Sequence, residues 1–177
     1  MIRKILLIAC FVLTSSINAQ GISQDYNVLK NTSLTNSHET NGKKTLLEAI
    51  KTAGMMETFE SEGPFTLFIP DEAALTNLPS EYSLKTLMKQ GNKKKLKDLV
   101  GYFVVKGNFK ANDLIDLVKE NDGEATLETL IGETLTLSLS YGDVKIKDKQ
   151  GNIATVAKPD INSSNGVVHV VDKVLIP

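Results

Sequence analysis

The C-terminal stretch constrains the fold most strongly, because nearly every residue in it favours one conformation. Residues 165–177 read NGVVHVVDKVLIP, and seven of these thirteen are Val, Leu or Ile. β-branched side chains favour an extended backbone, and the apolar pairs on either side of His169 predict a strand that is buried on both faces. Asn165 and Gly166 supply a turn into this strand, and Pro177 is suited to its end. We therefore expect folding to depend on these last residues.

The first nineteen residues have the layout of a secretory signal peptide. Two basic residues precede an apolar run over residues 5–13, and a small-residue stretch ends at Ala19, where cleavage is expected. The apolar run has nine residues, whereas a bilayer core needs about 20. Residues 7–10 also resemble a lipobox, but cleavage there would leave a very short apolar core. The prediction is a secreted or periplasmic protein, with a lipid anchor on Cys10 as the alternative.

Composition narrows the classes of partner. Removal of residues 1–19 leaves 18 basic residues, 21 acidic residues and no cysteine. A domain without disulfides must rely on its apolar core, and a chain of this length can bury enough surface to do so. The mild negative charge argues against a nucleic-acid partner, and no other apolar run is long enough to be a transmembrane segment. An extracellular or envelope protein, or a glycan, is the expected partner.

The chain divides into a polar tether and one domain. Residues 20–42 are rich in Asn, Ser and Thr without a sustained apolar period, so we expect a flexible tether before a domain over residues 43–177. From Thr45 onward, apolar residues recur at helical spacing or in short runs between Gly and Pro. The predicted elements are a helix over 45–53 with Thr45 as N-cap and Gly54 as its stop, a helical turn over 55–59, a strand over 65–69, a helical turn over 72–75 capped by Asp71, two helices within 83–100, a strand over 102–105, and a helix over 111–121 capped by Asn108 or Asn112.

After Gly123 the pattern changes to strands. Residues 134–141 alternate, with three leucines and Tyr141 expected on the buried face. Gly142 and Asp143 predict a two-residue hairpin turn, and further strands follow over 144–147 and 153–157. Helices followed by a β meander indicate an α+β domain.

One charged stretch has two interpretations. Lys93, Lys94, Lys95 and Lys97 lie in a predicted amphipathic helix. A solvated helix face is the preferred interpretation, and a patch that attracts a polyanion is the alternative.

Three stretches, at their observed separations, resemble the sequence boxes of fasciclin-like domains. Residues 66–75 read TLFIPDEAAL and resemble the first box, residues 99–107 resemble the central Tyr-His motif, and residues 165–177 are similar to the last box. The resemblance covers about residues 43–177 and implies a fasciclin-like β-sandwich or wedge flanked by several helices. It further implies a secreted, single-domain bacterial-type member that acts in adhesion to cells, matrix or other macromolecules.

The resemblance also implies candidate contact residues. Animal matrix members of the family are linked to integrin binding through an Asp-Ile pair and the Tyr-His motif. Asp160 and Ile161 match the pair, and Tyr102 matches the Tyr, but Phe103 stands where His is expected and cannot make the imidazole hydrogen bonds. These four residues are the predicted partner-binding residues. The alternative for Asp160 is a turn residue whose carboxylate accepts backbone N–H groups.

The sequence holds few residues suited to catalysis. The two histidines are His38, in the predicted tether, and His169, in a dense apolar strand where a structural role is expected. No Cys or His pair has metal-ligand spacing, and no dinucleotide or phosphate loop motif occurs. The sequence therefore predicts no catalytic residue, no metal site and no cofactor. The expected function is a non-catalytic module that binds another macromolecule; the alternatives are a polysaccharide or small-ligand binding module of the envelope and a surface lipoprotein of the same fold.

Overall fold

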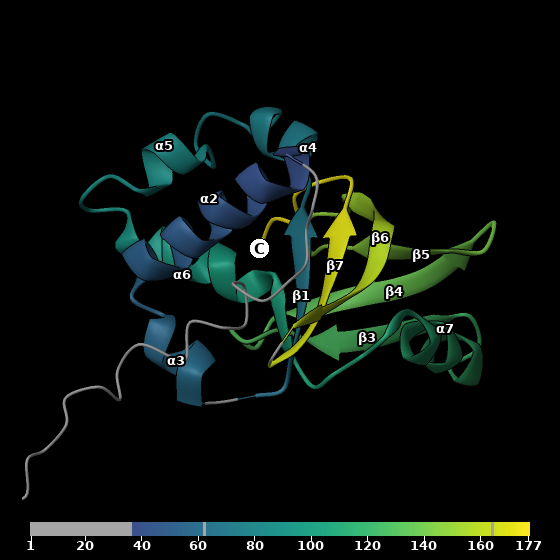
Figure 1. Ribbon diagram of the computed structural model, residues 1–177. Coiled ribbons are helices and arrows are strands. Elements are labelled where there is room, and N and C mark those ends of the chain that lie inside the picture. The colour runs from purple at the N-terminus through teal and green to yellow at the C-terminus, as the bar shows by residue number, and fades with distance from the viewer. Residues whose placement is uncertain (1–36, 62, 164) are drawn as a thin grey trace, which may run out of the picture.

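The computed structural model describes residues 37–61, 63–163 and 165–177 (Figure 1). The predicted signal peptide, Cys10 and residues 20–36 of the predicted tether lie outside them. The helices are α2 (Ser37–Ala53), α3 (Met56–Ser61), α4 (Glu72–Thr76), α5 (Leu84–Leu87), α6 (Lys93–Tyr102) and α7 (Ala111–Glu120). The strands are β1 (Phe65–Pro70), β2 (Val104–Lys106), β3 (Glu124–Glu128), β4 (Thr134–Ser140), β5 (Asp143–Lys147), β6 (Ile153–Ser163) and β7 (Gly166–Val171).

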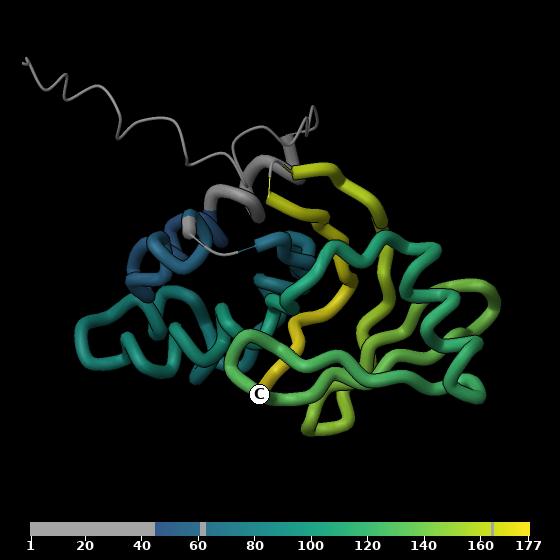
Figure 2. Tube along the Cα trace, turned by 90° about the horizontal axis from the view of Figure 1, so that it is seen from below, coloured from purple at the N-terminus to yellow at the C-terminus, as the bar shows by residue number. Residues whose placement is uncertain are grey.

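The described strands form one seven-stranded sheet in the order β2-β1-β7-β6-β5-β4-β3. Helices α2 to α6 gather at one side of β1 and β7, whereas α7 lies near β3 and β4 at the opposite end (Figure 1). The view from below shows the same division between the helices of the N-terminal half and the strands of the C-terminal half (Figure 2). The predicted α+β fold, a β-wedge flanked by helices, is confirmed.

Strand β7 is a buried interior strand of the sheet, as its sequence predicts. It pairs in parallel with β1 and antiparallel with β6, and Val167, Val168 and Val171 are at most 2% exposed. Gly166 begins the strand with a φ of 140°, and a Cβ there would collide with the carbonyl oxygen of Phe65. Only glycine therefore allows β7 to start this close to β1.

Strand β6 bends the sheet. Residues 153–155 pair with β5, Val156, Lys158 and residues 161–163 pair with β7, and the register shifts on both sides of Lys158. Such bulges bend a strand and increase its twist. At the far ends of the bent sheet, a bridge joins Val105 to Thr129, and Leu130 N–H donates to Val104 O at 2.7 Å. The sheet thus wraps around one core.

Local stop and cap signals set the end of α2 and the start of α4. Gly54 has a φ of 72°, and its N–H and that of Met55 donate to Lys51 O and Ile50 O, which forms a Schellman motif at the end of α2. Asp71 begins α4, because its carboxylate accepts the Ala74 N–H at 2.7 Å. Both predicted signals are confirmed.

Other local predictions are wrong. Helix α2 already begins at Ser37, so Thr45 lies inside the helix and is not its N-cap. Extending a helix adds one hydrogen bond per residue, which a local cap motif does not prevent. Tyr102 is the last residue of α6 rather than the first residue of a strand. Strand β2 begins at Val104.

Two turns also differ from prediction. The β4–β5 turn consists of Tyr141 and Gly142, both at positive φ, so Tyr141 is fully exposed instead of buried. Helix α7 starts after Lys110, whose N–H donates to Asp113 Oδ2 at 2.8 Å, and neither predicted asparagine caps it. A carboxylate inside the first turn replaces the cap that the sequence pattern suggested.

Candidate functional site

The predicted Asp-Ile pair lies in the bulge of β6. Residues 157–160 are exposed and Ile161 is half-buried. Asp160 has a φ of 59°, in the left-handed region that Asp tolerates better than bulky residues. We call residues 157–161 the β6 bulge.

Asp160 fixes the bulge against the start of α7. Its Oδ1 accepts the Ala111 N–H at 2.8 Å, which satisfies one of the free donors at the N-terminus of that helix. The Asp160 N–H donates to His169 Nδ1 at 3.3 Å. The expected turn role, a carboxylate that accepts a backbone N–H, is present, but the donor comes from a distant element rather than from the local turn.

His169 holds the bulge from the core side. The side chain is 0% exposed, its ring stacks on Phe68 with centroids 5.5 Å apart, and Nε2 lies 2.8 Å from Phe109 O. Because Nδ1 accepts from Asp160, we assign the ring proton to Nε2, which donates to Phe109 O. Burial lowers the pKa of His169, although the Phe109 hydrogen bond and the Asp160 charge oppose this shift. The predicted structural role of His169 is confirmed.

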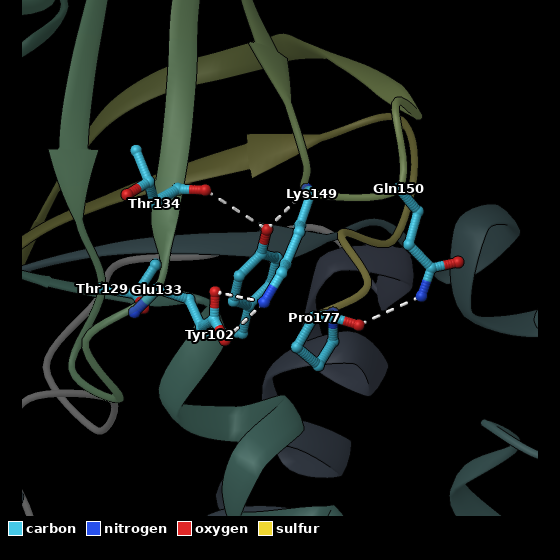
Figure 3. Close-up of polar contacts among 7 residues, drawn as sticks. All are labelled: Tyr102, Thr129, Glu133, Thr134, Lys149, Gln150 and Pro177. Carbon is cyan, nitrogen blue, oxygen red and sulfur yellow. Dashed lines mark hydrogen bonds and ion pairs between the residues drawn. The ribbon is translucent and has the colours of Figure 1, made fainter.

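The other predicted pair lies in the core. Tyr102 is 0% exposed and Phe103 4% exposed, so neither side chain reaches the surface. Tyr102 Oη accepts the Lys149 N–H at 2.9 Å and donates to Thr134 O at 3.4 Å (Figure 3). Burial raises the pKa of the Tyr102 hydroxyl. Tyr102 therefore joins α6 to β4 and the β5–β6 turn.

The fold does not bring the two predicted pairs together. Phe103 O accepts the Phe68 N–H at 2.8 Å, and Phe68 in β1 is paired with His169 in β7. Strands β1 and β7 thus separate Phe103 from Asp160 in β6.

The buried carboxylate of Asp148 holds the C-terminal residues in place. This residue was not singled out from the sequence. Asp148 is 4% exposed and accepts the N–H groups of Gln150, Asn152 and Ile176 at 2.8 to 3.0 Å. Gln150 Nε2 also donates to Pro177 O at 3.0 Å (Figure 3). An Asp two residues before a Gln-Gly-Asn turn is a recognisable turn signal, but nothing local indicates that Ile176 completes it.

Two further surface features lie outside the predicted pairs. A groove of about 410 Å³ runs between α4 and the C-terminal segment, with Asn77, Asn152, Asp172 and Lys173 among its lining residues. Tyr141 is the other feature, a fully exposed aromatic side chain at the tip of the β4–β5 hairpin.

Metal sites and membrane spans are two other features that a surface protein can carry. Across residues 37–61, 63–163 and 165–177, no three or more His, Cys, Asp or Glu side chains are arranged to hold a metal ion. No helix in this described part combines the length and apolarity of a membrane span.

Comparison with known proteins extends the resemblance seen in the sequence. The sequence model of the family described as "Fasciclin domain" matches residues 41–177. "Protein sll1483" of Synechocystis sp. is 38% identical over 133 residues, covering 75% of this chain and 66% of that protein. Human periostin is 30% identical over 126 residues, covering 71% of this chain and 13% of periostin.

Among solved structures, a FAS1 domain pair from the insect cell adhesion molecule fasciclin I is similar, with a TM-score of 0.60 and 18% identity. The match covers 77% of this chain and 46% of the insect chain, and it shows a shared fold. The chain thus spans less than two thirds of several proteins it matches.

Proposed function

Because this chain belongs to the fasciclin domain family, a family of cell-adhesion modules, we propose that it is a non-catalytic adhesion module that binds another protein through the β6 bulge. We place it outside the cytoplasm, secreted or in the cell envelope. The signal-peptide layout of residues 1–19 supports this location. The insect protein of similar fold is a cell adhesion molecule, which supports the adhesive role by analogy.

The single observation that carries this proposal is an exposed aspartate in a bulge that is hydrogen-bonded to β7 and to the start of α7. Asp160 is exposed, yet its backbone is bonded to His169 and its carboxylate to Ala111. A surface that is already ordered loses little conformational entropy on binding, which favours affinity. The second carboxylate oxygen of Asp160 and the neighbouring half-buried Ile161 supply one polar and one apolar contact.

The non-catalytic part of the proposal rests on His169. A general base needs a free ring nitrogen within reach of a substrate. Both nitrogens of His169 are engaged by Asp160 and Phe109, and the side chain is 0% exposed. His169 therefore has no free ring nitrogen with which to act as a general base.

The experiment compares two aspartates that share exposure and backbone conformation but lie in different parts of the fold. Asp160 and Asp122 are both exposed and both at positive φ, 59° and 55°. Asn tolerates this backbone region, so Asp160→Asn and Asp122→Asn each remove one charge without backbone strain. Residues 20–177 would be tested by surface plasmon resonance against a panel of purified matrix proteins, collagen among them, and on a glycan array.

We expect saturable binding to a protein of the panel, weakened about tenfold by Asp160→Asn and less than twofold by Asp122→Asn. Equal effects of the two variants would contradict the role of the bulge. Saturable binding to a small neutral glycan without protein binding would instead support the second candidate, a small-glycan module that uses the groove beside α4. The amide and charged groups of Asn77, Asp172 and Lys173 in that groove favour this candidate.

A further inference from the structure

The helix pair α5–α6 carries an unusual concentration of positive charge. Residues 83–97 contain six lysines and no acidic residue, whereas the rest of the sequence holds 14 basic and 21 acidic residues. All six lysines are exposed. We call these the α5–α6 lysines: Lys85, Lys89, Lys93, Lys94, Lys95 and Lys97.

The fold gathers these lysines at one end of the molecule. Leu96, Leu99 and Val100 form the buried stripe of α6 and turn its lysines outward. Asn92, before α6, donates from Nδ2 to Thr86 O at 2.9 Å and so ties the start of α6 to α5. The charges of two helices and their connecting loop therefore form one surface.

The opposite end of the molecule is acidic. Residues 111–128, which include α7 and β3, hold six acidic residues and one lysine. Helices α5 and α7 lie at opposite ends of the fold (Figure 1). The net charge of the chain is thus close to zero, although its basic and acidic residues concentrate at opposite ends of the molecule.

Four of the α5–α6 lysines make no ion pair with the side chains that the structure describes. Lys94 pairs with Asp98 at 3.0 Å, and Lys93 reaches Gly54 at the negative end of the α2 dipole. The remaining four, Lys85, Lys89, Lys95 and Lys97, make no ion pair with the side chains described over residues 45–60, 63–163 and 165–177. Three lysines in the first turn of α6 also face the positive end of its dipole, where anions are preferred.

From these observations we infer that the α5–α6 lysines form a binding surface for an anionic polysaccharide that bears carboxylate or sulfate groups. The charges are spread over two helices and a loop, which fits an extended polyanion better than a single ion. The contact lies on elements other than the β6 bulge and does not depend on the function proposed there.

The surrounding surface favours a polysaccharide over other polyanions. Membrane-binding helices combine lysines with exposed apolar anchors, but the exposed large apolar side chains of the described residues are Tyr141 and Ile153, both outside this surface. Single-stranded nucleic acids stack their bases on aromatic side chains, and residues 83–97 contain none.

The test uses two variants of residues 20–177 with equal charge change. The patch variant replaces Lys85, Lys89, Lys95 and Lys97 by Gln. The control variant replaces four exposed lysines outside the proposed sites by Gln, namely Lys106, Lys119, Lys147 and Lys149. Binding to alginate, as the carboxylate probe, and to heparin, as the sulfate probe, is measured at low and high salt, with dextran as a neutral glycan.

We expect wild type to bind at least one charged probe and not dextran, with binding lost at about 1 M salt, where the Debye length is only about 3 Å. The patch variant should bind about tenfold more weakly, and the control variant and Asp160→Asn within about twofold of wild type. Equal melting temperatures of the two lysine variants would show that both remain folded. Absence of alginate and heparin binding at low salt, or equal losses in both lysine variants, would overturn the inference. Tighter lysine-dependent binding to phosphatidylglycerol vesicles or duplex DNA would overturn it as well, in favour of that partner.

Discussion

Strands β6 and β7 lie side by side in the sheet but serve opposite purposes. In β7 the three valines at positions 167, 168 and 171 and His169 are buried, and every one of its residues is paired with β1. In β6 the stretch from Ala157 to Asp160 is exposed, and the register with β7 shifts there. Strand β7 is thus part of the core, whereas residues 157–160 of β6 leave the regular ladder and are exposed to solvent. Burial on both faces thus marks a strand on which folding depends, whereas the departure of its neighbour from the ladder leaves the exposed residues on which the proposed contact is placed.

The largest effect should come from removing the end of β7. Deletion of Val171 to Pro177 removes Val171, Leu175 and Ile176 from the core, together with the N–H of Ile176 that Asp148 accepts. We expect no cooperative unfolding transition by circular dichroism. A soluble truncated protein that melts cooperatively would show that β7 and its extension are peripheral.

Next in size is the loss of the His169 side chain. His169→Ala leaves a cavity beside Phe68 and two backbone groups without partners, so the free energy of unfolding should fall by about 3–5 kcal/mol in urea titrations. The exposed Asn162 of β6 provides the comparison. Asn162→Ala should change the free energy of unfolding by less than about 0.5 kcal/mol. If the two variants were equally stable, the contrast between the strands would fail.

A smaller effect is expected from Asp160 itself. Asp160→Ala removes the acceptor for the Ala111 N–H and places Ala at a φ of 59°, which together should cost about 1–2 kcal/mol. Asp160→Asn keeps the acceptor and tolerates this φ, so its unfolding free energy should stay near that of wild type. Wild-type stability of Asp160→Ala would mean that the bulge is not held by this contact.

The smallest expected effect is a dependence on pH. Because the folded-state pKa of His169 is lowered, the unfolded chain binds more protons than the folded one when pH falls below about 6.5. The contribution of neutral His169 is complete above that pH and is lost as pH decreases, by at most about 1.4 kcal/mol per pH unit. Urea titrations between pH 7.5 and 5.5 should show a steeper loss for wild type than for His169→Gln. Identical slopes would remove His169 as the cause.

Much of the fold was predictable because its signals are local. The stop at Gly54, the cap at Asp71 and the buried run at Val167–Val168 each depend on residues close in sequence. Alternation of apolar residues likewise predicted β4 and the antiparallel strands that follow it. Tyr141 was misplaced because the turn lies one residue earlier than the Gly142-Asp143 signal suggested.

The sequence singled out four partner-binding residues, and their role in binding stays a prediction. Asp160 and Ile161 were recognisable in the sequence, and both lie at the β6 bulge. Tyr102 and Phe103 lie in the apolar run 102–105, which is consistent with burial, but the resemblance implied that they are contact residues; the structure buries both.

The sequence by itself determined the family, the buried character of β7 and the concentration of lysine in residues 83–97. Composition and short-range periodicity are sufficient for such features. Only the tertiary structure decided that Asp160 meets Ala111 and His169, that Asp148 fastens Ile176, and that the basic and acidic stretches lie at opposite ends. These contacts join residues that are 9 to 49 positions apart, and which of them form depends on the pairing of whole strands.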